Sequence, residues 1–187
     1  MVVLGSGGHT AEMLTLLRSM DCHARYTPRL YVIASTDGHS KTKMSQFEES
    51  LMQQRHKASS SSSASSSLGY ATYLVPRSRE VGQSYLSSVW TTAYAFVYSV
   101  AIVLRTMPDL ILCNGPGTCV PICVAAYIPK FFGWKHITLV YVESLCRVKS
   151  LSLSGRLLAP LVDHFFVQWP QLLPRSPAGT LYLGRLC

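Results

Sequence analysis

The sequence has few charged residues and, among them, few acidic ones. Charged side chains make up 14% of the 187 residues, whereas about 25% is ordinary in globular domains. The 9 Asp and Glu residues stand against 17 Lys and Arg, which gives a net charge of +8. This shortage of acid groups argues against an acidic binding surface and favours phosphate-bearing ligands, an anionic membrane surface or nucleic acid.

Familiar metal, redox and nucleotide signatures are also missing. The 6 cysteines form no CxxC pair and no paired metal spacing, which argues against zinc ribbons and thioredoxin-like sites. The glycine cluster GSGGHT at 5–10 has Thr10 where a GxGxxG fingerprint has its third glycine, and it lacks the lysine of a Walker loop. Asp37 stands far from these glycines for a ribose-binding carboxylate. We therefore expect reduced, mostly packed thiols, no metal and no bound cofactor.

No secretory leader precedes the first predicted strand. MVVLG at 1–5 is a short apolar run ending in glycine, which leaves no room for a charged start followed by an apolar stretch. The sequence therefore predicts a domain that faces the cytosol. With 187 residues, 48% of them hydrophobic, the chain is long enough for a single domain, 1–187, with a substantial core.

Strands and helices alternate along the chain. Near-continuous apolar runs, typical of strands in a parallel sheet covered on both faces, lie at 1–5, 29–36, 70–76, 109–114, 136–144 and 163–169, with a short seventh at 181–184. Helical spacing of apolar residues predicts helices at 9–20 and 41–57, and a short buried helix within 118–134. The fold class is thus α/β, with a doubly wound, mostly parallel Rossmann-like sheet. The serine-rich segment 58–69 is predicted to be a disordered surface insertion.

One uncharged segment, 81–104, admits two interpretations. It is long enough to span a bilayer, but its first half is polar and it occupies the place of the crossover helix between the third and fourth strands. Trp90, Tyr94 and Tyr98 recur every four residues, which favours a core stripe, with contact to a membrane surface as the alternative. A separate apolar tip is also predicted to face a membrane. It consists of Phe131, Phe132 and Trp134.

Glycine-rich and basic segments follow several predicted strands. Because the carboxyl ends of parallel strands share one edge of a sheet, these segments are expected to converge there. Glycines let the amides of a helix start approach an anion, and arginines bind phosphate in a bidentate way. The predicted acceptor or phosphate ligands are Gly5, Ser6, Gly7, Gly8, Thr10, Arg77, Ser78, Arg79, Asn114, Gly115, Gly117, Thr118 and Arg147. Plain turns and solvated charges are the structural alternatives, and Thr118 is also expected to cap the helix after it.

Two residues at this edge are candidates for a general base. His9 ends the first glycine cluster, and a neutral imidazole there accepts a proton from a hydroxyl or hydrogen-bonds a phosphate. Glu143 ends an apolar strand, with Arg147 four residues on as a counter-ion. The sequence leaves open which of His9 and Glu143 is the base. It also leaves open that Glu143 and Arg147 form a purely structural ion pair.

Six segments together carry a family resemblance. In order, they are GSGGHT, PRSREVGQS, DLILCNGPGTCVPIC, VYVESLCRVKSLSLSG, VQWP and YLGR. They closely resemble the asparagine-linked glycosylation 14 family, and the resemblance runs from Val2 to Cys187. The sequence departs from the family in its serine-rich insertion and in having no membrane helix before the first strand, so we expect the family's N-terminal membrane anchor to be absent.

The resemblance implies one subunit of a two-chain transferase. Such a subunit binds the lipid acceptor at the cytosolic face of the endoplasmic reticulum membrane and recruits an asparagine-linked glycosylation 13-type catalytic subunit, which binds the donor. The complex transfers GlcNAc from UDP-GlcNAc, in β1,4 linkage, to GlcNAc-diphosphate-dolichol in N-glycan precursor synthesis. The chain then resembles the N-terminal half of a GT-B glycosyltransferase, is inactive alone, and binds neither cofactor nor nucleic acid.

The resemblance also suggests roles for the candidate residues. The first glycine cluster would hold the acceptor diphosphate, Arg77 and Arg79 would reinforce it, and Asn114 with its glycines would line the cleft between subunits. His9 or Glu143 would remove the proton of the acceptor 4-hydroxyl. Two other functions stay open: a non-catalytic membrane scaffold and a stand-alone nucleotide-dependent Rossmann enzyme.

Overall fold

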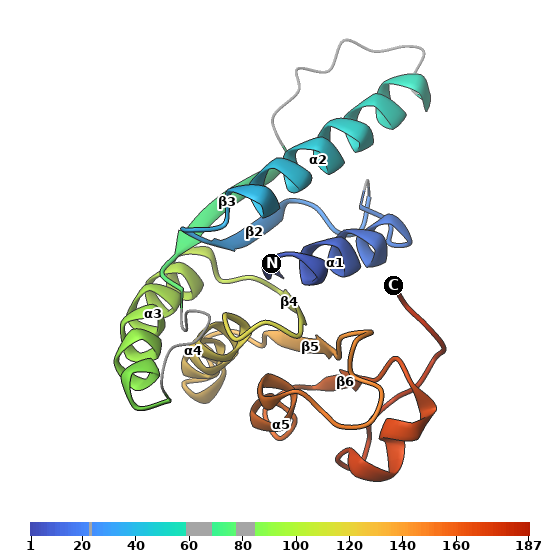
Figure 1. The fold of residues 1–187 in the computed structure, drawn as a ribbon. Helices are drawn as coiled ribbons and strands as arrows, with labels where there is room; N and C mark the ends of the chain where they lie inside the picture. The colour runs from blue at the N-terminus through green and yellow to red at the C-terminus, as the bar shows by residue number, and fades with distance from the viewer. Residues whose placement is uncertain (23, 59–68, 78–84) are drawn as a thin grey trace.

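A parallel sheet forms the centre of the molecule (Figure 1). The computed structural model describes residues 1–22, 24–58, 69–77 and 85–187. Within them the strand order is β3-β2-β1-β4-β5-β6, and every pairing is parallel. The strands are β1 (Val2–Leu4), β2 (Arg29–Ala34), β3 (Tyr70–Val75), β4 (Leu110–Asn114), β5 (Thr138–Val142) and β6 (His164–Phe166). This is the order of a doubly wound Rossmann sheet, so the predicted fold class is confirmed.

Helices cover both faces of the sheet. On one side lie α1 (Gly8–Arg18) and α2 (Gly38–Ala58), and on the other α3 (Tyr85–Thr106), α4 (Cys119–Phe131) and the short α5 (Leu153–Leu158) (Figure 1). A 3₁₀ helix, η1 (Pro170–Arg175), follows β6. The alternation of strands and helices is the predicted one, and α3 occupies the predicted crossover position between β3 and β4.

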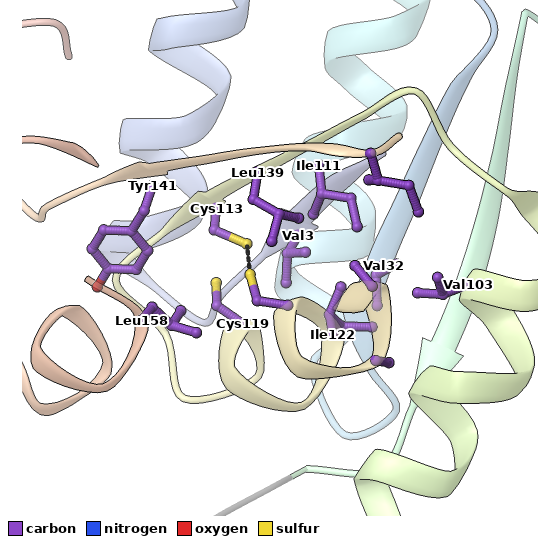
Figure 2. Close-up of a cluster of buried hydrophobic side chains, with 14 of the residues drawn as sticks. Val3, Val32, Val103, Ile111, Cys113, Cys119, Ile122, Leu139, Tyr141 and Leu158 are labelled. Carbon is purple, nitrogen blue, oxygen red and sulfur yellow. Dashed lines mark hydrogen bonds between the residues drawn. The ribbon is translucent and has the colours of Figure 1, made fainter. Parts of the chain in front are cut away.

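Each face of the sheet has its own hydrophobic core. Side chains alternate along β1, so that Val2 and Leu4 pack on the side of α1 and α2 while Val3 packs on the side of α3 and α4. The core on the side of α3 and α4 includes Cys113 and Cys119 (Figure 2). Cys123 belongs to the same core, and its sulfur atom lies 3.5 Å from that of Cys113. Burial raises the pKa of the Cys113 thiol. All 6 cysteines are free, which confirms the expectation of reduced, mostly packed thiols.

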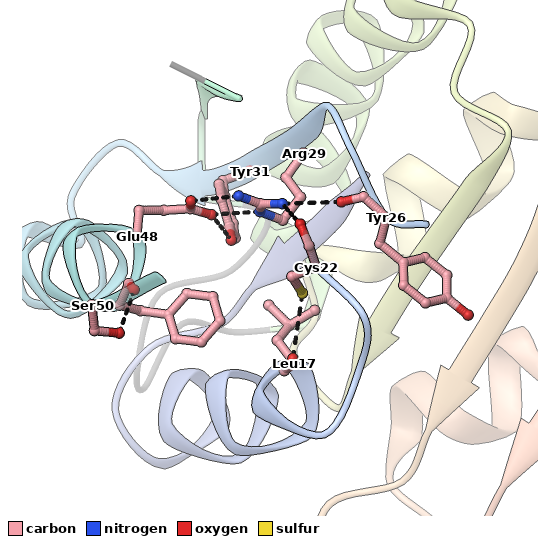
Figure 3. Close-up of polar contacts among 8 residues, drawn as sticks. Leu17, Cys22, Tyr26, Arg29, Tyr31, Glu48 and Ser50 are labelled. Atoms are coloured by element: carbon pink, nitrogen blue, oxygen red, sulfur yellow. Dashed lines mark hydrogen bonds and ion pairs between the residues drawn. The ribbon is translucent and has the colours of Figure 1, made fainter. Parts of the chain in front are cut away.

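A buried ion pair fastens α2 to the sheet. The Arg29 guanidinium on β2 makes two hydrogen bonds of 2.7 Å to the Glu48 carboxylate on α2, and the Tyr31 hydroxyl donates to the same carboxylate (Figure 3). Arg29 also donates to the carbonyl oxygens of Cys22 and Tyr26, which holds the loop after α1. The cluster lies near the amino end of β2, away from the predicted site.

Two further sequence predictions concern the segments 181–184 and 58–69. The predicted short seventh strand at 181–184 is wrong, because within the described residues this segment makes a single bridge, between Phe166 and Leu181. Of the predicted insertion at 58–69, Ala58 is the last residue of α2, and residues 59–68 lie outside the described residues.

The face that α3 presents to its surroundings is the reverse of the predicted one. Trp90, Tyr94 and Tyr98 are 80%, 56% and 43% exposed, so the expected core stripe is wrong. The buried positions of α3 are instead Ala95, Ser99, Ile102 and Val103. These smaller side chains allow α3 to pack closely on α4, and the large aromatic ones are left outside. By length and composition α3 is able to cross a membrane, and 22% of its window Val89–Thr106 is buried.

Candidate functional site

The ends of β1 and β4 bring His9 and Asn114 together. The sheet order reverses between these two strands, which is where open α/β sheets bind ligands. His9, in the first turn of α1, lies with its Nδ1 3.2 Å from Oδ1 of Asn114, the last residue of β4. The imidazole is partly exposed, whereas Asn114 is 1% exposed. The predicted convergence of the two glycine-rich segments is therefore present in the structure.

Glycines make this approach of two backbones feasible. Gly115 has a φ of 68°, and a Cβ there would lie 2.5 Å from Cε1 of His9. A Cβ on Gly5 would lie 2.6 Å from Cβ of Pro116. Only residues without side chains let the two segments meet at these positions, so the glycines are required by packing as well as by any ligand.

The first glycine segment is held from beneath by two hydroxyls. Thr10 donates a hydrogen bond to the Gly5 carbonyl, and the Ser40 hydroxyl lies 2.6 Å from that of Thr10. Ser40 in turn donates to Asp37, which accepts from both its hydroxyl and its backbone N–H at the start of α2. Thr10 is 0% exposed. Its side chain therefore shapes the turn, and the role of Thr10 as a phosphate ligand stays a prediction.

The start of α1 is open to solvent. Ser6, Gly7 and Gly8 are exposed. Gly7 is the N-cap residue, with φ 65°, and no side chain caps the helix. Free N–H groups at a helix start attract anions, because the helix dipole and the unpaired donors act together. This geometry is the one that the sequence predicted for a diphosphate.

Glu143 lies beneath the same edge and is 0% exposed. Its carboxylate accepts hydrogen bonds from the Ser144 N–H at 3.0 Å, from the Ser152 N–H at 2.9 Å and from the Ser152 hydroxyl at 3.1 Å. Ser152 is also the N-cap of α5, and Tyr141 lies 3.0 Å from its hydroxyl. Burial, with the nearby Glu143 charge, raises the pKa of Tyr141.

Sequence reasoning missed a second link across the site. Glu12 on α1 accepts hydrogen bonds from the Ser144 hydroxyl at 2.9 Å and from the Leu145 N–H at 3.3 Å. It thereby joins α1 to the segment after β5. The position of Glu12 one turn after His9 was the available signal, because residues three apart on a helix share a face.

The predicted arginine ligands that the structure describes do not lie together with the other residues of the predicted site. Arg77 follows β3, the outermost strand and two strands from β1, about 10 Å at ordinary strand spacing. Arg147 is exposed, and the ion pairs of the described residues do not include it, so its expected pairing with Glu143 is wrong. Glu143 is satisfied by backbone and hydroxyl groups instead. Ser78 and Arg79 lie outside the described residues.

The remaining candidates lie at the start of α4. Gly117 is exposed and Thr118 is buried as the N-cap residue of α4. The expected capping by Thr118 is wrong, because its backbone is already helical and its side chain makes no capping hydrogen bond. Across the described ranges, no group of three or more His, Cys, Asp or Glu side chains is arranged to hold a metal ion.

A separate cavity of about 300 Å³ lies at the amino edge of the sheet. Its lining includes Leu30 and Leu110, at the beginnings of β2 and β4, together with Asp109 and Lys135. None of the predicted site residues lines it. The candidate site lies at the opposite, carboxyl edge of the sheet, away from this cavity.

The solved structures include one with the same fold over most of this chain. The crystal structure of Acinetobacter baumannii MurG superposes with a TM-score of 0.61 at 11% sequence identity, covering 97% of this chain and 44% of that one. At this identity the likeness shows the fold alone. The chain therefore corresponds in fold to about half of that structure.

Sequence comparisons are closer. The UDP-N-acetylglucosamine transferase subunit ALG14 of Mus musculus is 49% identical over 186 residues, which cover 100% of this chain and 82% of that protein. The proteins of the same name are 47% identical in Homo sapiens, with the same coverage, and 45% identical in Schizosaccharomyces pombe, covering 98% of this chain and 81% of that protein. The family described as "Oligosaccharide biosynthesis protein Alg14 like" matches residues 1–186, so the chain belongs to this family.

Proposed function

We propose that this chain is the acceptor-binding subunit of a two-chain transferase that moves GlcNAc from UDP-GlcNAc to GlcNAc-diphosphate-dolichol in N-glycan precursor synthesis. The observation that carries the proposal is the joining of His9 and Asn114 beside the uncapped start of α1, at the point where the strand order reverses. The names of the relatives support the transferase and its subunit character. An asparagine-linked glycosylation 13-type subunit completes the proposed complex by supplying the donor site, and no cofactor takes part.

The start of α1 is the proposed site of the acceptor diphosphate. Its exposed N–H groups carry no side-chain cap, and the Asn114 Nδ2, a buried amide nitrogen, has no hydrogen-bond partner among the described residues. A ligand oxygen would satisfy both. Arg77, which follows β3, is proposed to add charge once the acceptor is bound, and Arg79 is proposed to act in the same way.

His9 is the proposed general base, in preference to Glu143. His9 is partly exposed, whereas Glu143 is 0% exposed and already accepts hydrogen bonds from Ser144 and Ser152. In the proposed step, His9 takes the proton of the acceptor 4-hydroxyl while that oxygen forms a bond to the anomeric carbon of GlcNAc. The bond from this carbon to the diphosphate breaks, UDP leaves with the electron pair, and the anomeric configuration inverts.

The exposed face of α3 is the proposed contact with the endoplasmic reticulum membrane, on its cytosolic side. Trp90, Tyr94 and Val97 are each more than half exposed and share one side of the helix. Because α3 joins two strands of one sheet and packs on α4, we propose that it lies on the membrane rather than crosses it. A scaffold without a catalytic role would use the same face, and the activity assay separates the two.

The test is transfer from labelled UDP-GlcNAc to a short-chain GlcNAc-diphosphate lipid. The assay compares this chain alone, the partner subunit alone and the two mixed. We expect product only from the mixture. Product from this chain alone would place the donor site here and overturn the division of labour.

A point variant tests the catalytic step within the complex. Replacing His9 by alanine is expected to lower kcat by about 100-fold to 10,000-fold, the usual contribution of a general base, with the complex still forming. The matched control is His136→Ala, since His136 is an exposed histidine between α4 and β5, at the opposite edge. Normal turnover by both variants would favour the scaffold function.

A further inference from the structure

Asn114 has one bonded end and one free end. Its Oδ1 lies 3.2 Å from Nδ1 of His9, while its Nδ2 is buried and without a hydrogen-bond partner among the residues that the structure describes. A buried amide N–H left unpaired costs about 1–3 kcal/mol, so such a group is rarely kept without use.

The orientation of this amide decides which nitrogen of His9 is basic. A carbonyl oxygen accepts, so Oδ1 facing Nδ1 requires that Nδ1 carries the proton in the neutral ring. The lone pair then lies on Nε2, on the other side of the ring. If the amide were turned over, Nδ2 would donate to Nδ1, the proton would lie on Nε2, and that nitrogen would be unable to accept one.

We infer that Asn114 is a positioning residue that fixes His9 in the tautomer with the proton on Nδ1, and that its free Nδ2 donates to an oxygen of the bound acceptor. The inference rests on the proposed function for the identity of the acceptor. A substrate oxygen on Nδ2 keeps the amide from turning over, so acceptor binding and the basicity of Nε2 are coupled through one side chain.

An asparagine suits this task better than a carboxylate. Among the described residues, the titratable and charged groups near the carboxyl ends of the strands include Glu12 on α1, Asp37 before α2, Glu143 after β5, Arg77 after β3 and Arg147 after β5. The three carboxylates accept hydrogen bonds from other groups, and none bonds to His9 among the described contacts. The neutral amide therefore orients the ring without adding a charge that would keep it protonated.

The test begins with the tautomer itself, measured on the full chain in complex with its partner subunit. Nitrogen-15 labelling of the histidines, with His9→Gln for assignment, reports which ring nitrogen is protonated. We expect the proton on Nδ1 in the native chain and a shift of the population toward Nε2 in Asn114→Ala. A native ring protonated on Nε2 would overturn the inference without any activity measurement.

A second variant adds a charge at the same place. Asn114→Asp sets a carboxylate beside Nδ1, which is expected to move the titration midpoint of the His9 ring up by about 1 to 3 pH units. The acid limb of the kcat profile is expected to follow it, and KM for the acceptor lipid to rise in both Asn114 variants because the Nδ2 donor is gone. An unmoved midpoint in a folded Asn114→Asp complex would overturn the inference.

A control variant and a comparison of two measurements distinguish the possible outcomes. Tyr31→Phe removes a buried hydroxyl far from the site and serves as the control for loss of stability, with an unchanged pH profile. If the midpoint moves in Asn114→Asp but the kcat profile does not, the positioning of His9 by Asn114 stands and the assignment of His9 as the base fails. Failure of the inference and of the proposed function are thereby separated.

Discussion

Adding one methyl group at Gly115 tests whether the position of His9 matters for function. A Cβ at Gly115 would lie 2.5 Å from Cε1 and 2.8 Å from Nδ1 of the His9 ring. Ordinary contact begins at 3.4 Å, so the ring has to move by about 0.9 Å, the difference between 3.4 and 2.5 Å. A displacement of this size in a catalytic group costs roughly 100-fold in rate. We therefore expect Gly115→Ala to lower kcat by about that factor.

Gly115→Ala also introduces backbone strain, and the effect of this strain has to be measured separately. Gly115 has φ +68°, where an L-residue costs about 1–2 kcal/mol more than glycine. For a domain of this size that corresponds to a fall in Tm of about 2–8 °C. Gly133 is the matched control, because it has φ +67° and nothing within 4 Å of its Cβ position.

The two alanine variants are compared by thermal unfolding and by GlcNAc transfer in the complex. We expect similar falls in Tm, and a loss of transfer in Gly115→Ala alone. Equal, near-native kcat in both folded variants would refute the claim that the ring position set by Gly115 is needed. Equal losses of kcat would show that strain, and not the contact with His9, is responsible.

Three further substitutions test the supporting structure. Glu143→Gln replaces one accepting oxygen with a donor and is expected to cost about 1–3 kcal/mol of unfolding free energy, with kcat of the folded complex largely kept; an unchanged Tm with a 1,000-fold fall in kcat would make Glu143 the base. Arg29→Met leaves the Glu48 charge buried and is expected to cost about 3–5 kcal/mol, most of it recovered when Glu48→Met is added; denaturant unfolding of both variants decides this, and additive losses would contradict it. Burial by itself raises the pKa of Asp163, but hydrogen bonds from Lys130 and a backbone N–H outweigh it, so the pKa is lowered. The stabilisation by Asp163 is therefore complete above its ordinary pKa near 3.9 and is lost as the pH falls through the lowered value, so the free energies of unfolding of Asp163→Asn and native protein should differ at pH 6 and converge as the pH falls below that lowered pKa.

The sequence was sufficient to predict the sheet, because a strand that is buried on both faces is a near-continuous run of apolar residues. The runs at 29–36 and 70–76 are observed as β2 and β3, with the ends shortened by one or two residues. The failure at 181–184 has the same origin. Three or four apolar residues satisfy the pattern, but a strand needs a partner along its whole length, and within the described residues this segment makes one bridge, between Leu181 and Phe166.

The orientation of α3 was not predictable from periodicity alone. Trp90, Tyr94 and Tyr98 have the spacing of a buried stripe, and so do Ala95, Ser99 and Val103 on the opposite side. Which side packs depends on α4, since two helices that cross closely need small residues between them.

Within the site, the sequence predicted the convergence of segments but not the functions of single side chains. The glycines, His9 and Asn114 were singled out and lie together. Thr10 was singled out too, yet it is buried under the turn. A polar residue at a strand end either faces the ligand or supports the residue that does. Only the folded structure shows which of these two roles a given residue has.

The polar groups of this edge are consistent with half of a binding site. Below the surface these polar groups form hydrogen bonds with one another. Glu143 is hydrogen-bonded to Ser144 and Ser152, and Glu12 joins α1 to the segment after β5. Among the described residues, the exposed α1 start has no side-chain cap and the buried Nδ2 of Asn114 has no hydrogen-bond partner. The satisfied groups fix the backbone, whereas the unsatisfied ones need a ligand and a second surface that excludes water. A separate donor-binding subunit would supply that surface, which is why the mixing experiment has to come before any variant is interpreted.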